Sequence, residues 1–199
     1  MTKNQIVLLY GMPAAGKLTM ARRLAGEGNS FLLDDHLFLN FVTQFVDNRD
    51  YRAWGTERFN DLMADFRFEF IKILSEFYRK DAAARYIFTI VLFSQKRIEF
   101  IKALDRLADE MSGDFFPIYL SVRPEVLKTR CAAPEREQRG KLHRPEQYDE
   151  VFGGRFEQME FEHPNRVTID SSDLSEDETF AAIKNHLGVP AYAGMTDAG

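Results

Sequence analysis

Residues 11–19 read GMPAAGKLT, and this stretch decides the fold. It has the form G-x-x-x-x-G-K, which binds phosphate through its backbone when it lies between a strand and a helix. Both flanking elements are predicted here. Gln5–Tyr10 is a run of β-forming, mostly apolar residues, typical of a strand buried on both faces of a parallel sheet. Residues 17–25 then place apolar side chains at helical spacing, and Gly26 and Gly28 end the helix.

The residue types of this loop suit the binding of an anion. Successive backbone N–H groups turn inward only where the chain tolerates unusual φ and ψ angles and carries no bulky side chains. The helix that starts near Gly16 adds the positive end of its dipole, and Lys17 can reach the β and γ phosphates of a nucleotide. The alternative is a glycine-bounded turn that follows a strand by chance. The residues expected to contact a nucleotide here are Gly11, Ala14, Ala15, Gly16, Lys17, Leu18 and Thr19.

The rest of the chain alternates between predicted strands and predicted helices. Right-handed crossovers between such strands produce a parallel sheet with helices on both faces, so we expect an α/β fold. Residues 37–80 read as two helices broken near residues 48–55. Because Pro117 has no N–H to donate to a neighbouring strand, we expect the fourth strand to begin at or after it. The predicted strands are residues 5–10, 31–33, 86–93, 116–122 and 166–170, and the other predicted helices are residues 95–110, 124–130, 145–161 and 176–187.

Composition and charge limit the class of protein. A chain of 199 residues with 45% hydrophobic and 29% charged residues suits one globular domain, which we expect to span residues 1–189, followed by a flexible tail at residues 190–199. No apolar run approaches the roughly 20 residues of a membrane span, so we expect no membrane partner. The single cysteine, Cys131, suits a reducing cytoplasm, and the net charge of −5 argues against a nucleic-acid partner. The oligomeric state stays open.

The residues after the loop lysine narrow the class of nucleotide-binding protein. Leu18 stands where a Ser or Thr hydroxyl usually binds Mg²⁺ directly, and Thr19 follows it. This order resembles adenylate kinases, in which the metal is held largely through water. The resemblance implies ATP and Mg²⁺ as cofactors, with Thr19 helping to place the metal. The chain also lacks the Asn-Lys-x-Asp motif by which GTPases recognise guanine.

From about Gln5 to Leu187 the chain resembles the nucleoside-monophosphate kinases and the shikimate and gluconate kinases. The resemblance implies a three-layer P-loop NTPase fold whose five-stranded parallel sheet has the order 2-3-1-4-5. It also implies a helical acceptor-binding region at residues 37–80 and a basic lid at residues 131–144. The identity of the acceptor cannot be carried over from this group, so it stays open between a small molecule and a nucleotide.

An acidic pair follows the second predicted strand, where members of this group carry acidic residues that face the γ-phosphate. By resemblance, one of these aspartates would orient the acceptor hydroxyl and accept its proton. Asp35 is the first candidate for this role, and Asp34 is the second. The next residue, His36, would contact the acceptor. The alternative is that either aspartate caps the helix predicted from Leu37.

Arg67 is a second expected acceptor ligand. The string Phe66-Arg67-Phe68-Glu69 resembles the Phe-Arg pair with which shikimate kinases bind the carboxylate of their substrate, and a guanidinium group suits a carboxylate or a phosphate. The alternative is a solvated helix arginine paired with a nearby acid. Two features differ from shikimate kinases, because the third strand does not lead into a triple glycine and the two aspartates are adjacent instead of D-x-D.

The third predicted strand, Tyr86–Phe93, departs from the usual pattern of P-loop proteins. It does not end in the aspartate that normally helps to hold Mg²⁺, and it is apolar apart from Thr89. The metal must then be held by Thr19, by Asp34 or Asp35, or through water.

Basic residues gather after the fourth predicted strand. Residues 123–144 contain seven Lys or Arg against three Glu, and residues 122–130 match the V-x-x-x-x-L-x-x-R pattern that leads into the lid of adenylate kinases. A positive loop that closes on a nucleotide would stabilise the charge of a transferring phosphoryl group. Residues 170–172 lie where relatives wrap the adenine, although they could only cap a helix, and the basic segment could only be a solvated loop. By resemblance, the arginines that act are Arg130 against the adenine and Arg136 and Arg139 on the phosphates.

Three hypotheses for the function follow. The leading one is an ATP-dependent phosphotransferase with Lys17, Asp35, Asp34 and Arg136 as catalytic residues. The second is a nucleotide-dependent binding module or switch, which Leu18 and the missing acid on the third strand motivate. The third is a kinase that acts on nucleic-acid ends, and the acidity of the chain outside the lid makes it the weakest.

Overall fold

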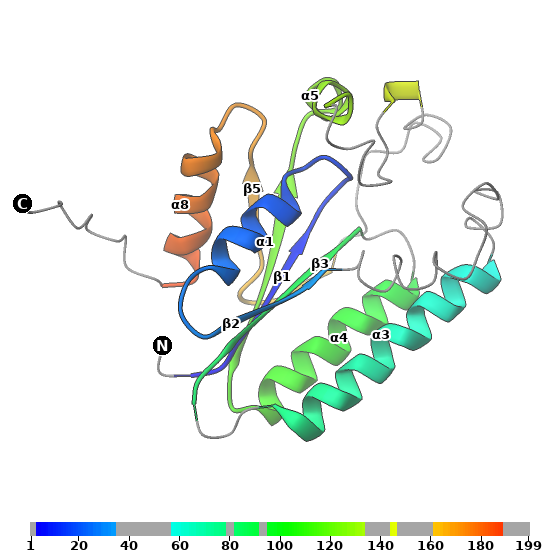
Figure 1. Cartoon of the computed structure of the whole chain (residues 1–199), viewed down its shortest axis with the longest axis vertical. Helices are drawn as coiled ribbons and strands as arrows, with labels where there is room; N and C mark the ends of the chain where they lie inside the picture. The colour runs from blue at the N-terminus through cyan, green and yellow to red at the C-terminus, as the bar shows by residue number, and fades with distance from the viewer. Residues whose placement is uncertain are drawn as a thin grey trace, which may run out of the picture.

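Five parallel strands form the centre of the protein (Figure 1), as a computed structural model shows. Their order is β2-β3-β1-β4-β5, which confirms the predicted α/β class and strand order. The strands are β1 (Gln5–Tyr10), β2 (Ser30–Asp34), β3 (Arg85–Ile90), β4 (Asp114–Ser121) and β5 (Val167–Asp170). The helices are α1 (Lys17–Ala25), α3 (Glu57–Phe77), α4 (Gln95–Glu110), α5 (Pro124–Cys131) and α8 (Glu176–His186). The structure describes residues 3–34, 57–78, 82–91, 95–133, 144–146 and 161–188.

The central strand, β1, carries five consecutive apolar residues, and all five are buried. Side chains from Ile6 to Tyr10 are at most 1% exposed. The last of them, Tyr10, lies opposite Ile90 of β3 and Tyr119 of β4, so the three strands run in register. Since the strands are parallel, their C-terminal ends meet at one edge of the sheet, which is where ligands bind in open α/β sheets.

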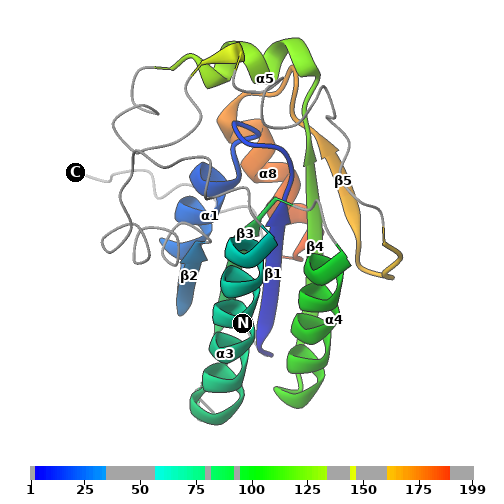
Figure 2. The ribbon, with the colours of Figure 1, turned by 90° about the vertical axis from the view of Figure 1, so that its right-hand side faces the viewer.

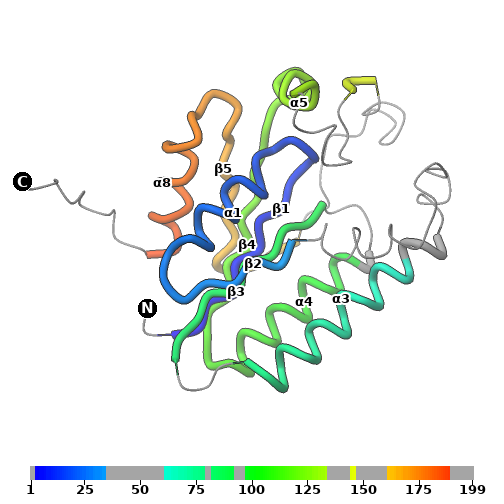
Figure 3. Tube along the Cα trace, viewed as in Figure 1, coloured from blue at the N-terminus to red at the C-terminus, as the bar shows by residue number. Residues whose placement is uncertain are grey.

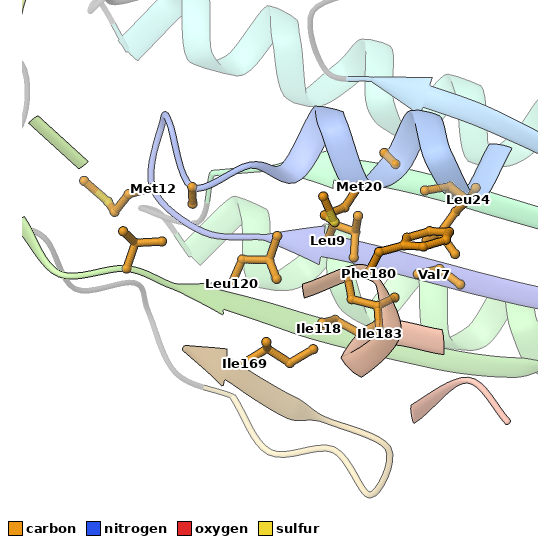
Figure 4. Close-up of a cluster of buried hydrophobic side chains, with 14 of the residues drawn as sticks. Val7, Leu9, Met12, Met20, Leu24, Ile118, Leu120, Ile169, Phe180 and Ile183 are labelled. Atoms are coloured by element: carbon orange, nitrogen blue, oxygen red, sulfur yellow. The ribbon is translucent and has the colours of Figure 1, made fainter. Parts of the chain in front are cut away.

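Helices cover both faces of the sheet and complete three layers. α1 and α8 lie on one face, and α3 and α4 lie on the other (Figure 2, Figure 3). Alternate residues of β1 point to the two faces because side chains alternate along a strand. Val7 and Leu9 pack under α1 and α8, where Figure 4 shows them with Phe180. On the other face, Leu8 and its neighbours pack against α4.

The fourth strand begins earlier than its proline suggested. The prediction that it starts at or after Pro117 is wrong, because β4 starts at Asp114 and Pro117 lies opposite Leu8 of β1. The pairing of β4 with β5 begins only at Ile118, so at the proline β4 has a partner strand on one side alone. A residue without an N–H is tolerated at such an edge position.

Other element boundaries agree with the sequence to within one residue where the structure describes them, except that β3 ends at Ile90 and the predicted strand ran to Phe93. Residues 17–25 and 95–110 form helices with the predicted bounds. In the predicted helical region at residues 37–80, α3 accounts for residues 57–77, while the break near residues 48–55 and the first helix lie outside the described residues. The lid beyond Ala133, most of the helix at 145–161 and the tail also lie outside them. Among the helices of the described residues, none combines the length and apolar character needed to cross a membrane.

The start of α8 is fixed by a capping box, which gives a first stability prediction. The Ser175 side chain accepts a hydrogen bond from the Glu178 backbone N–H, and the Glu178 carboxylate accepts one from the Ser175 backbone N–H. Replacing Ser175 by Ala should lower the free energy of unfolding by about 1 kcal/mol, measured by urea denaturation. The control is Ser112→Ala, in an exposed turn at the other end of the sheet. A Ser175→Ala protein as stable as that control would contradict the prediction.

Candidate functional site

The loop between β1 and α1 has the backbone that an anion site requires. Gly11 has a φ of 154°, and a Cβ added there would lie 2.5 Å from the Leu120 carbonyl oxygen of β4. Gly16, with a φ of 88°, is the N-cap of α1, and Ala14 between them has a φ of 67°. A glycine N-cap has no side chain that could accept hydrogen bonds from the first N–H groups of its helix. The positive end of α1 is therefore presented to the loop.

Lys17 lies over this loop. Its Nζ donates hydrogen bonds to the carbonyl oxygens of Gly11, at 2.9 Å, and Met12, at 2.8 Å. These contacts place the ammonium group beside the loop backbone instead of in bulk solvent. An anion held by the loop and by the N-terminus of α1 would meet this positive charge directly.

An aspartate and a threonine lie at the same edge of the sheet, on the two strands next to β1. Asp34 is the last residue of β2, and its Cα partner on β3 is Thr89. Thr89 Oγ1 donates a hydrogen bond of 2.5 Å to Asp34 Oδ1, with Asp34 8% and Thr89 5% exposed. Asp34 is therefore the last residue of a strand, and the helix that it was suggested to cap, from Leu37, lies outside the described residues. Asp35 and His36 lie outside the described residues.

Arg67 is buried on α3, at 5% exposure. The alternative in which it is a solvated helix arginine is therefore wrong. Burying a guanidinium group costs free energy unless the group is paired or hydrogen-bonded. The burial of Arg67 therefore indicates a polar or acidic partner. The neighbouring Phe68 packs edge-to-face on Phe100 of α4. This contact holds this part of α3 against α4, on the same face of the sheet. A role for Arg67 in binding an acceptor stays a prediction.

The helix that leads into the predicted lid, α5, is tied to the loop between β5 and α8. Arg130 Nη2 donates a 2.8 Å hydrogen bond to the Ser171 carbonyl oxygen. Arg123 forms a two-pronged ion pair with Asp173, at 2.6 and 2.7 Å, and its backbone N–H donates to Ser172 Oγ. The structure thus brings together Arg130 and residues 170–172, both of which the sequence suggested for the adenine. Arg136 and Arg139 lie outside the described residues.

Asp170 has a lowered pKa, which gives a pH prediction. Hydrogen bonds from the Ser172 hydroxyl and the Ser172 backbone N–H are the main causes, and the Arg123 guanidinium adds to them. A carboxyl whose folded pKa is depressed adds stability above its unfolded pKa, and this stability is lost as the pH falls through its folded pKa. Replacing Ser172 by Ala should raise the pKa of Asp170, measured by carboxyl-carbon NMR. The stability difference from wild type should shrink below about pH 4, and an unmoved Asp170 titration would contradict this.

The described residues include oxygen donors that suit Mg²⁺ but no ready-made metal cluster. No group of three or more His, Cys, Asp or Glu side chains gathers within them. Mg²⁺ is typically held by one or two carboxylates together with substrate phosphates and water, so such a cluster is not required. Thr19, on the exposed first turn of α1, and Asp34 supply oxygen atoms of the right kind. In the sequence Thr89 stands out only as a polar residue in an apolar strand. Its bond to Asp34 depends on β2 lying next to β3, which no local pattern shows.

Comparisons with known proteins agree with this architecture. No protein-family model and no curated protein matches the chain. The structure is similar to an APS kinase from Mycobacterium tuberculosis, solved in complex with AMPPNP and APS, with a TM-score of 0.57 and 13% identity over 94% of this chain and 99% of that one. It is also similar to thymidylate kinase from Candida albicans, with a TM-score of 0.55 and 12% identity over 94% and 92% of the two chains. For a gluconokinase from Sinorhizobium meliloti the TM-score is 0.51, with 11% identity over 94% and 97%.

These similarities establish the fold. Together with the strand order and the loop, they identify an α/β P-loop NTPase fold. The finer resemblance to shikimate-kinase-like proteins stays a prediction.

Proposed function

We propose that this P-loop protein is an ATP-dependent phosphotransferase that moves the γ-phosphate of ATP to a small-molecule or nucleotide acceptor. One observation carries the proposal: the Lys17 ammonium lies over a strand–loop–helix unit whose helix N-terminus opens onto the loop. The buried carboxylate of Asp34 ends a strand at the same edge of the sheet. A phosphate cradle beside a carboxylate is the arrangement that phosphoryl transfer to an acceptor requires.

In this proposal the loop amides and Lys17 bind the β and γ phosphates. The oxygen of the acceptor forms a bond to the γ-phosphorus as the bond from that phosphorus to the bridging oxygen of ADP breaks. If the acceptor is a hydroxyl group, its proton passes to the carboxylate of Asp35, or of Asp34 in second place. Arg136 and Arg139 would stabilise the charge on the transferring group. The acceptor would be held by Arg67 and His36.

The adenine would lie against Arg130, beside the loop that follows β5. The hydrogen bond from Arg130 to Ser171 supports this placement, because it holds the guanidinium group at that loop.

Mg²⁺, when bound, would neutralise charge on the β and γ phosphates. Thr19 and Asp34 are the described residues whose oxygen atoms suit it. We also propose that the protein acts in the cytoplasm.

A second function has two observations in its favour. In the described part of β3, from Arg85 to Ile90, no acidic residue is present, and Leu18 replaces a metal-binding hydroxyl. A P-loop protein weakened in this way could bind nucleotide without transferring phosphate and act as a switch for a protein partner. The basic segment of the predicted lid and the aspartate pair at residues 34 and 35 count against it, since a switch needs no acceptor pocket.

Nucleotide titration followed by an acceptor screen tests both functions. Titration calorimetry with Mg·ATP and Mg·GTP is expected to detect ATP binding. Release of ADP should then rise at least about tenfold when the correct pool of hydroxyl or phosphate acceptors is added, with a phosphorylated product visible by ³¹P NMR. ATP binding without any phosphorylated product would favour the switch. Absence of nucleotide binding would remove both proposals.

A further inference from the structure

We propose that Thr89 is a positioning residue that orients the Asp34 carboxylate, so that β2 supplies the metal-side acid that β3 lacks. The inference rests on the proposed function and assigns a part of its site. It names the residue that carries the carboxylate and the residue that fixes its orientation.

The strand register places both side chains on the face of the sheet that α1 covers. Thr89 lies opposite Leu9 of β1, and Leu9 belongs to the core under α1. Ile87 and Leu32, two residues before Thr89 and Asp34, pack against the same core. Since alternate residues of a strand share a face, Thr89 and Asp34 also point to the side of α1. They therefore lie at the strand ends, on the side of the helix that carries Lys17 and Thr19.

Thr89 stands on the strand that normally ends in the metal-holding acid. Its hydroxyl is neutral, so it cannot supply the negative charge that a carboxylate places near a divalent cation. What it does instead is donate a hydrogen bond to the acid of the neighbouring strand. In this arrangement the acid stands on β2 instead of β3. Because Asp34 lies opposite Thr89, the acid is still at the same edge of the sheet.

The chemistry of the bond makes it suited to orientation. An ionised carboxylate only accepts hydrogen bonds, so the Thr89 hydroxyl must be the donor. Threonine is branched at Cβ and stiff in its χ1 angle, so its hydroxyl points in a fixed direction. Both side chains are buried, and water competes poorly for a bond in such a place. The bond therefore limits rotation of the carboxylate.

The competing explanation is that the bond only ties the edge strand β2 to β3. Backbone pairing already joins these strands over all five residues of β2, from Ser30 to Asp34. A hydrogen bond that only joined the two strands would add to the stability of the fold and would not affect the binding of Mg²⁺. The two explanations differ in how nucleotide affinity depends on Mg²⁺, which is a binding measurement and does not require turnover.

The experiment compares the dissociation constant of ADP in Mg²⁺ with that in EDTA, by titration calorimetry on the full chain. Wild type is expected to bind ADP more tightly with Mg²⁺. Thr89→Val, which keeps the shape and removes the donor, should reduce the ratio of the two constants about tenfold and leave the constant in EDTA within about twofold. Thr89→Ser, which restores a donor, should recover most of the ratio. The matched control is Thr168→Val, at an exposed position of β5, which should leave the ratio unchanged.

A second variant keeps the test decisive if Thr89→Val does not fold. In Asp34→Asn the side chain still accepts the hydrogen bond from Thr89 but carries no charge. This variant therefore keeps the bond between β2 and β3 and should lose the dependence of ADP affinity on Mg²⁺. An unchanged ratio in Asp34→Asn or Thr89→Val, or a wild type that binds ADP equally with and without Mg²⁺, would overturn the inference alone. A wild type that binds no nucleotide would overturn the proposed function and this inference together.

Discussion

Replacing Lys17 by Ala is expected to weaken ATP binding by about tenfold to a hundredfold and to abolish phosphoryl transfer. The ammonium group makes two hydrogen bonds to the loop backbone and faces the region where the phosphates would bind. A hydrogen bond that involves a charged group contributes about 1.5–3 kcal/mol, which corresponds to this range of affinity. Transfer suffers more than binding, because negative charge accumulates on the phosphate oxygens in the transition state. Titration calorimetry with ATP and an assay of ADP release measure the two effects.

The matched control is Lys3→Ala. Lys3 is an exposed lysine just before β1, at the opposite end of this strand from the loop, and its contact with Asp114 is a loose 3.7 Å. Its loss should change neither affinity nor turnover. Thermal unfolding of both variants shows whether Lys17→Ala acts through the site or through the fold. Wild-type affinity and turnover in a folded Lys17→Ala protein would remove the loop from the proposed mechanism.

The sequence predicted best those elements whose local pattern and tertiary role coincide. Gln5–Tyr10 is uniformly β-forming and lies between two neighbours, so its pattern and its burial agree and its bounds match β1. Residues 17–25 begin after a glycine-bounded loop and end at glycine, and the helix has these same bounds. Strand order followed from the family resemblance and not from any local signal.

The points that the sequence left open, and the one prediction that was wrong, depended on neighbours that a sequence does not display. Pro117 argued for a later start of β4, yet at this position the partner strand β5 has not begun. Arg67 was as consistent with a solvated helix face as with burial, and only the packing of α3 decided between them. Thr89 was an isolated polar residue until the sheet placed it opposite Asp34. In each case the missing information was which residue lies across a strand or helix contact.

Gly11 and Gly16 offer a contrast that separates the fold from the site. In Gly11→Ala the new methyl group would lie 2.5 Å from the Leu120 carbonyl oxygen, which belongs to the backbone of β4. That oxygen cannot turn away as a side chain could, so β1 and β4 must shift at the end of the sheet. We expect a loss of about 2–4 kcal/mol in the free energy of unfolding, seen as a fall in melting temperature of roughly 4–16 °C.

Gly16→Ala should behave differently, because a Cβ added there meets nothing within 4 Å. Its φ of 88° costs an alanine only about 1–2 kcal/mol, so the protein should stay folded. The methyl group would nevertheless enter open space at the N-terminus of α1, where the loop amides are proposed to bind phosphate. Gly16→Ala is therefore expected to lose nucleotide affinity with a small loss of stability, whereas Gly11→Ala loses both. If Gly16→Ala kept wild-type affinity for ATP, the phosphate site could not lie at this helix terminus, and the proposed role of the loop would fall.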